Sequence, residues 1–356
     1  MSNSKSHTSE IREFFKGTTY LDPTYDPAFK EFFGEEETLK NFLNGLLHLE
    51  GKDRIQKLSF KFEEEIRFRT PYPKNLTFDI FASSENGRFF DIEMQKADHA
   101  FFIDRAILYN AFLAIRAKQE MEHSPEFLSL SKDEQRKQRY RLPETVSIWI
   151  CNFDLPETDG KAIDRWFLYS EGSIGKGTSD PVSTRNSYII INLPRFTKTA
   201  EKISRPEEVW LYLLKHAGIS ENLPHFGNEI FEAALERIKV DFAKDEFLNT
   251  QEKAMIAQEE IECRIAEGRI DARKKGLAEG REEGREEGRE EGREEGREEG
   301  RKEGREEGLA EGRAKGLAEG REKALIEIAV GLRNDGVPMQ IIERRTGLTK
   351  EQIAAL

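Results

Sequence analysis

The sequence predicts a mixed α/β fold. Three observations lead to this prediction: helical and strand patterns alternate between residues 26 and 217, a β-hairpin motif lies at 76–95, and the aromatic residues are concentrated before residue 250. A chain of 356 residues has the length of two folded units, or of one larger unit with appendages. Residues 268–322, in contrast, are almost only Gly, Arg, Glu, Lys and Ala, so this segment cannot form an apolar core.

The elements follow one another in a clear order. Asp26–Lys30 opens an amphipathic helical region that Gly51 closes, and its apolar residues recur at the spacing of a core-facing helix. Strand patterns follow at 55–62, 66–68, 76–84 and 88–95. The other expected elements are a helix at 100–118, a polar insertion at 124–139, strands at 146–153, 166–169 and 188–193, and helices at 206–217 and 228–266.

The composition excludes several classes of protein. The longest apolar run, around Ile189–Leu193, is far shorter than the ~20 residues that cross a bilayer. The first ten residues lack the basic-then-apolar pattern of a secretory signal. Two cysteines far apart in sequence predict neither a disulfide framework nor a zinc site. A net charge of −12 argues mildly against a nucleic-acid coat protein, although bound metal ions let an acidic chain meet phosphates. We therefore expect a cytoplasmic protein with no membrane partner.

The hairpin motif LTFDIFASSENGRFFDIEMQ at 76–95 is the most informative stretch. A three-residue loop, Glu85-Asn86-Gly87, pairs Ser84 with Arg88 and sets Asp79 opposite Glu93. A two-residue loop on Asn86-Gly87 would instead separate the two carboxylates onto opposite faces. We favour the first register. It places Asp79, Asp91, Glu93 and Gln95 on one face, and Phe78, Ile80, Ile92 and Met94 on the other.

Two carboxylates opposed across a hairpin suit a divalent metal site. Asp79 and Glu93 offer the oxygen ligands that Mg²⁺ prefers, together with the backbone carbonyl of Met94. Gln95 could orient a water, and Arg105 on the following helix could reach a phosphate oxygen. The alternative is that these side chains form the polar outer face of a half-buried hairpin, which strands show routinely.

Five segments of this sequence resemble a known family, and they occur in the family's order between about residues 20 and 260: DPAFKEFFG, FDIFASSENGRFFDIEMQ, DRAILYNAFL, YRLPETVSIWICNFDL and YIIINLPRF. They are similar to the recombination-promoting nuclease (Rpn) family, also called PD-(D/E)XK nuclease family transposases. The resemblance implies a restriction-endonuclease-like α/β core and metal-dependent cleavage of DNA phosphodiester bonds. The repetitive tail and its terminal helical piece are similar to those of many members.

The resemblance also assigns roles to residues. Asp79 matches the family's metal-binding aspartate, Glu93 its second acid, and Gln95 its third motif position. Two further residues, Arg105 and Tyr109, match a recurrent Arg-x3-Tyr on the next helix. Asp26 and Lys30 fall in the N-terminal helix motif. The superfamily usually has a lysine at the position of Gln95. A glutamine can orient a water but cannot take its proton.

The C-terminal part follows a different pattern. From Gly276 to Gly320 glycine recurs every fourth residue, which predicts a marginal helix or a solvated spacer, with a GxxxG-like association face as the alternative. The last residues read as a helix-turn-helix-like module or a small stability cap, with its final helix capped by Thr349. The expected domains are a flexible N-terminus at 1–20, a nuclease-like domain at 21–225, a helical extension at 226–267, a repeat spacer at 268–322 and the terminal module at 323–356.

The sequence therefore predicts a Mg²⁺-dependent DNA endonuclease that promotes recombination or accompanies mobile elements. The alternatives are an idle nuclease fold that binds DNA or itself, and a purely structural partner-binding protein. Self-association through the C-terminal region, as a homodimer or a larger assembly, is compatible with all three. The DNA site, the biological role and the oligomeric state are not encoded in any motif that we identify.

Overall fold

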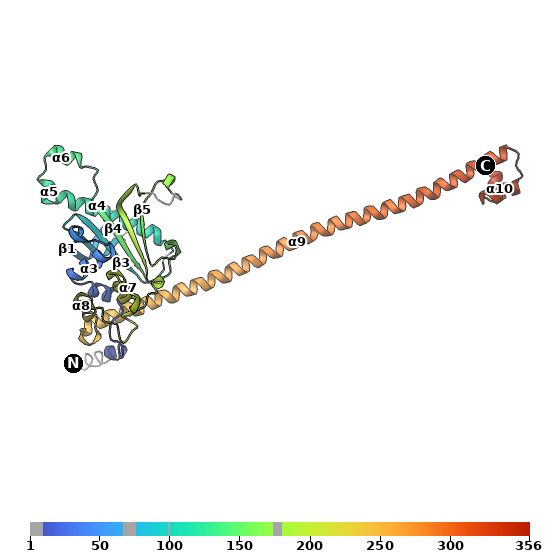
Figure 1. The fold of residues 1–356 in the computed structure, drawn as a ribbon. Helices are drawn as coiled ribbons and strands as arrows, with labels where there is room; N and C mark the ends of the chain where they lie inside the picture. The colour runs from blue at the N-terminus through green and yellow to red at the C-terminus, as the bar shows by residue number, and fades with distance from the viewer. Residues whose placement is uncertain (1–9, 67–75, 99, 174–179) are drawn as a thin grey trace. The chain divides into compact units, whose positions relative to one another are not determined.

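The structure, a computed structural model, describes residues 10–66, 76–98, 100–173 and 180–356. The chain divides into two compact units, Met1–Ile265 and Ala266–Leu356. In the first unit, helices and strands alternate around one sheet (Figure 1). Helix α9 begins in the first unit and continues into the second.

The sheet of the first unit has six strands in the order β1-β2-β3-β4-β6-β5. Strands β1, β2 and β3 form an antiparallel meander, β3, β4 and β6 are parallel, and the edge strand β5 is antiparallel to β6. The parallel strands make the mixed α/β class that the sequence predicts. Their bounds are β1 Leu58–Ile66, β2 Leu76–Ser84, β3 Arg88–Gln95, β4 Glu144–Cys151, β5 Ile163–Leu168 and β6 Ser183–Asn192.

Helices cover both faces of this sheet. One face carries the larger apolar cluster, formed with residues of α2, α3, α7 and α8. The other face carries a smaller cluster that Phe102, Tyr109 and Leu113 of α4 share with Trp149 and Ile190 of the sheet. The helices of this unit are α2 Asp26–Phe32, α3 Glu36–Leu46, α4 Phe102–His123, α5 Pro125–Leu128, α6 Lys132–Lys137, α7 Pro206–His216 and α8 Glu229–Arg237.

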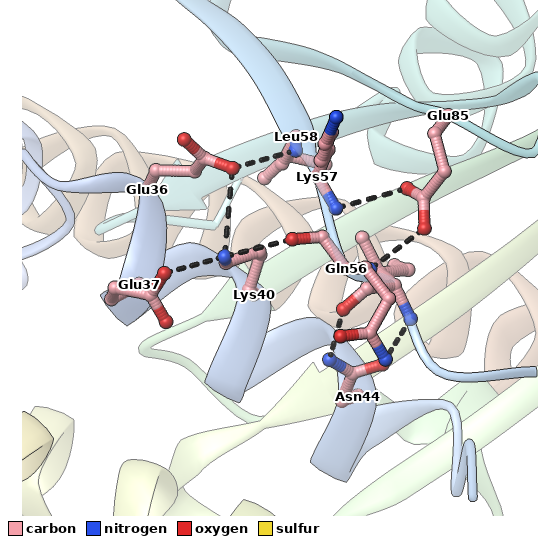
Figure 2. Close-up of polar contacts among 9 residues, drawn as sticks. Glu36, Glu37, Lys40, Asn44, Gln56, Lys57, Leu58 and Glu85 are labelled. Atoms are coloured by element: carbon pink, nitrogen blue, oxygen red, sulfur yellow. Dashed lines mark hydrogen bonds and ion pairs between the residues drawn. The ribbon is translucent and has the colours of Figure 1, made fainter. Parts of the chain in front are cut away.

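The loop of the β2–β3 hairpin is fixed by its glycine and by its glutamate. Gly87 has a φ of +72°, as the three-residue loop requires. The Glu85 carboxylate accepts hydrogen bonds from the backbone N–H groups of Gln56 and Lys57, at 2.7 and 3.1 Å (Figure 2). Asn44 of α3 holds the same incoming segment through two hydrogen bonds with the backbone of Ile55. The hairpin is thereby tied to the start of β1 and to α3.

One expectation for the first unit is wrong in detail. The helical pattern at 228–266 is two helices, because residues 238–240 leave the helix and pair with the N-terminal segment: Leu21 N donates to Ile238 O, and Val240 N to Thr19 O. Tertiary pairing therefore overrides helix propensity there. Residues 1–20, which we predict to be flexible apart from a short apolar patch at Ile11–Phe15, are described from residue 10 onward. Residues 1–9 lie outside the described residues, but Ile11 and Phe15 are buried in the core.

The second unit contains the glycine repeat and the terminal module. Helix α9, Asp245–Asn334, includes the whole repeat, and a Cβ at any glycine from 276 to 320 would meet nothing within 4 Å. Helices α10, Met339–Thr346, and α11, Lys350–Ala355, pack on the end of α9 through Ala329, Ile342 and Ile353. Thr349 and Gln352 form the predicted capping box.

Within the described residues, the helices include none that combines the length and the apolar character needed to cross a bilayer.

Replacing Gly87 with alanine tests the hairpin loop. An L side chain at this φ destabilises the fold by about 1 kcal/mol, which lowers the midpoint of urea unfolding. Gly172→Ala is the matched control, because a Cβ meets nothing within 4 Å at either position and only Gly87 has a positive φ. Equal midpoints for the two variants would contradict the loop assignment.

Candidate functional site

The two acids that the sequence singles out, Asp79 and Glu93, are brought together by the hairpin register. Ile80 lies opposite Ile92 and Phe81 opposite Asp91, so the same register sets Asp79 opposite Glu93. Two hydrogen bonds of 2.9 Å cross between the strands: Asp79 N donates to Glu93 Oε1, and Met94 N donates to Asp79 Oδ2. Each carboxylate is thus held by the backbone of the opposite strand, and the three-residue loop register is confirmed.

The face assignment of one neighbour is wrong. Phe78 packs with Phe81 and Tyr109, on the α4 side of the sheet, rather than with Ile80. The regular alternation of β2 breaks here because Glu63, which falls opposite Asp79 between the pairs Phe62–Ile80 and Glu64–Phe78, has a φ of +53°. A positive φ in a glutamate is a strained conformation that marks functional sites, and no sequence pattern predicts it.

A third carboxylate, Asp91, lies on the same face beneath Glu93. Asp91 and Glu93 are both fully buried. Ser147 Oγ donates to Asp91 Oδ2 at 3.0 Å, and Trp149 Nε1 donates to Ser147 Oγ at 2.9 Å. Asp91 lies on the face that the hairpin pattern predicts for it, although the pattern predicts no role for it. The sequence feature that could have indicated a role for Asp91 is its i, i+2 spacing to Glu93. Its partner Ser147 could not be predicted, because it lies on a strand distant in sequence.

Burial of three neighbouring carboxylates disfavours their charged forms. Desolvation raises the pKa of Asp79 to about 6, against the opposing hydrogen bond from Met94 N–H. Desolvation likewise raises the pKa of Asp91 to about 7. The pKa of Glu93 is raised well above its ordinary value by burial, and then by the charges of Asp79 and Asp91. The acids therefore retain protons near neutral pH unless a cation offsets their charge.

Helix α4 brings a cation to this site. Arg105 Nη2 lies 3.9 Å from Glu93 Oε2 and donates a hydrogen bond of 3.2 Å to Tyr109 Oη. The Arg105 guanidinium also lies over the rings of Tyr109 and Trp149, at 5.0 and 5.6 Å from their centroids. Desolvation raises the pKa of Tyr109 to about 12, so this phenol stays neutral. Arg105 is about one-third exposed, so its guanidinium is accessible to a substrate while its position is fixed.

Helix α2 borders the site without a direct hydrogen bond to the paired acids. Lys30 Nζ lies 2.7 Å from Asp26 Oδ2 and 2.6 Å from Glu63 Oε1. Asp26 and Lys30 are close enough for their charges to shift the pKa of Asp79 in opposite directions. The hydrogen bond from Lys30 holds the pKa of Glu63 below its ordinary value. Asp26 and Lys30 thus lie at the rim of the site. Glu63, which the sequence does not single out, lies there with them through its ion pair with Lys30.

Gln95 ends β3 beside the acids. It pairs with Cys151 of β4, its carbonyl accepts a hydrogen bond from Asn152 N at 2.9 Å, and its side chain is half-buried. Lys96, the next residue, is held elsewhere by Asp22 and Thr24 and lies over the Tyr25 ring. Lys96 therefore does not take the place of Gln95 at the paired acids.

The residues present fit a divalent cation. Among the described residues, no group of three or more His, Cys, Asp or Glu side chains has a metal-holding arrangement. Mg²⁺, however, is typically held by one or two carboxylates and keeps several waters or substrate oxygens. Asp79 and Glu93 are two such carboxylates, each fixed by a backbone N–H, in a place where a cation would offset their buried charge. Their donor set suits a hard cation.

The raised pKa values predict how the metal-free protein responds to pH. A carboxyl whose pKa is higher in the folded than in the unfolded state binds more protons when folded, so stability falls as pH rises through this window. In EDTA we expect the melting temperature to fall as the pH rises from about 4, where unfolded carboxyls titrate, to about 7, the folded value of Asp91, by a few degrees per kcal/mol lost. Glu93→Gln should reduce this fall, and Glu120→Gln on the surface of α4 should not. Identical pH profiles for wild type and Glu93→Gln would contradict the electrostatic description.

Comparisons with known proteins agree with the geometry. The family model described as PD-(D/E)XK nuclease family transposase matches residues 23–263, about two-thirds of the chain. A search of curated proteins and a search of solved structures give no significant match. The mixed α/β unit with its six-stranded sheet is consistent with a PD-(D/E)XK-like fold. Nucleases of this kind generally use divalent metal ions. By this match, which covers both acids and α4, the chain belongs to the PD-(D/E)XK nuclease family transposases.

Proposed function

We propose that this chain is a Mg²⁺-dependent DNA endonuclease that hydrolyses phosphodiester bonds. The observation that carries the proposal is the pair of reciprocal hydrogen bonds that fixes Asp79 beside Glu93 in a family of nucleases. We assign the metal to these two side chains and to the backbone carbonyl of Met94, whose N–H already contacts Asp79. Bound Mg²⁺ would lower the pKa of a water and offset phosphate charge.

The protein's own groups then orient the substrate. Arg105 contacts a phosphate oxygen of the scissile group, and Tyr109 and Trp149 hold the guanidinium in place. Gln95 orients the attacking water through its amide but does not accept the water's proton, because an amide is not basic. Asp26 and Lys30 at the rim complete the charge balance around Asp79. Ser147 donates a hydrogen bond to Asp91, and Asp91 supports the position of Glu93.

A second candidate function has a specific observation in its favour. Gln95 stands where the superfamily usually has a lysine, and Lys96 is held elsewhere by Asp22 and Thr24. This observation favours an idle nuclease fold that binds DNA or another copy of itself, with the C-terminal unit supplying multivalency. Metal-dependent turnover distinguishes the two functions. Under either function, recombination or association with mobile elements is the role that we propose.

Plasmid cleavage by the purified chain tests the first function. With Mg²⁺ we expect nicked or linear DNA, and with EDTA none, because the acids need a cation to offset their charge. Asp79→Ala and Glu93→Ala should each lower the cleavage rate by more than about 100-fold, since each removes a metal ligand.

Glu120→Ala is the matched control, because Glu120 is a carboxylate on α4 that pairs with Arg116 outside the site. It should cleave at the wild-type rate. Undiminished Mg²⁺-dependent nicking by the folded Asp79→Ala variant would refute the site. Absence of cleavage by folded wild type would favour the idle fold.

A further inference from the structure

The polar insertion between α4 and β4 carries a basic and aromatic segment that the proposed site does not use. Residues 136–141 read RKQRYR, four cations around one tyrosine in a chain whose net charge is −12. Tyr140 is 86% exposed, and the Arg139 guanidinium lies 5.5 Å from the centroid of its ring. Within the described part of the chain, the ion pair of Arg136 with the exposed Asp133 is the one carboxylate contact of these cations.

This segment forms one wall of a groove. The groove has a volume of about 690 Å³ and is lined by Tyr140, Arg141 and Leu142 on one side and by Trp166, Arg185 and Tyr188 on the other. Arg185 ties the walls together, because its Nη1 donates a hydrogen bond of 2.6 Å to the Leu142 carbonyl. The groove therefore combines aromatic rings with cations over a short distance.

The strands under the groove are irregular at this point. The pairing of β5 with β6 shifts between Trp166 and Leu168, which turns side chains away from their regular alternation. Asn186 of β6 also lines the groove and has a φ of +59°. Leu168 and Leu142 are 61% and 40% exposed. Such exposed apolar and aromatic surface, bordered by arginines, is typical of a binding surface.

The groove lies on the same side of the sheet as the paired acids. Trp166 and Tyr188 pack against the cluster that contains Tyr109. Along one row of the sheet, Asp91 lies opposite Ser147, Ser147 opposite Tyr188, and Tyr188 opposite Trp166. Three strand spacings separate Asp91 from Trp166, about 14 Å. The groove and the acids therefore share the face of the sheet on which α4 packs.

We propose that this groove binds a single-stranded stretch of nucleic acid, with bases stacked on Tyr140 and Trp166 and phosphates on Arg141 and Arg185. The inference deepens the proposed endonuclease function, on which it rests, by naming a single-stranded segment as part of the substrate. Aromatic rings offer stacking surfaces that only unpaired bases can use, and arginines offer charge to the backbone. A stacked duplex presents its phosphates but hides the faces of its bases.

The test measures binding of a fluorescent oligothymidylate of about 16 nucleotides by anisotropy, with the full chain in EDTA. The Asp79→Ala background is used throughout, so that cleavage cannot consume the probe. Tyr140→Ala should weaken binding by about tenfold, because one stacked base is lost. Phe242→Ala is the matched control: Phe242 is 70% exposed and has Lys239 over its ring, but it lies outside the groove.

The phosphate contacts have their own readout. Arg141→Ala should lower the slope of log affinity against log salt by about 0.7, whereas Lys239→Ala should not change it. A blunt duplex should bind more weakly than the single strand. Equal affinity of wild type and Tyr140→Ala, or no preference for the single strand, overturns the proposal. Binding of a free REEG-repeat peptide in place of the oligonucleotide would also overturn it, because the groove would then hold the acidic tail.

This test is independent of cleavage. If the oligonucleotide binds and Tyr140→Ala weakens it, the groove assignment stands even where plasmid cleavage fails. If plasmid is cleaved but the oligonucleotide does not bind, the endonuclease function stands and the groove assignment falls.

Discussion

The site depends on one constraint, the register of the β2–β3 hairpin. Because side chains alternate along a strand, a shift of one residue would put Asp79 and Glu93 on opposite faces. Gly87 and Glu85 prevent that shift, the first by its positive φ and the second by hydrogen bonds to Gln56 and Lys57. The register then lets each acid accept a hydrogen bond from the opposite strand, so two like charges are held side by side. The rest of the site is arranged around this pair.

Holding these charges together has a cost in stability that a ligand can remove. The charges of Asp79 and Asp91 add to burial in raising the pKa of Glu93, although Arg105 lies 3.9 Å from it, so protons or a cation are needed to hold the acids together. Such a group of buried acids is unusual in a core but common where a protein holds a cation. Arg105 lies over the rings of Tyr109 and Trp149, which pack against each other, and these contacts hold its guanidinium near Glu93.

The hairpin could be predicted from the sequence because its determinants are local. Alternating apolar residues, a glycine in the loop and two acids at matching positions are all visible within twenty residues. The parts that could not be predicted depend on distant segments. Ser147, which donates a hydrogen bond to Asp91, lies on β4, and Glu63, which has a positive φ, lies on β1. The helix ends after α8 because the following residues pair with residues 19–21. The groove beside Tyr140 likewise needs β5 and β6, although the basic run itself is visible in the sequence.

The central claim is that the hairpin places Asp79 and Glu93 for one divalent cation. A crystal structure of the chain grown with Mn²⁺, with anomalous diffraction data, measures this directly. We predict one strong anomalous peak within coordination distance of an oxygen of each carboxylate. A peak on other residues with none between Asp79 and Glu93, or no peak at saturating Mn²⁺, would contradict it.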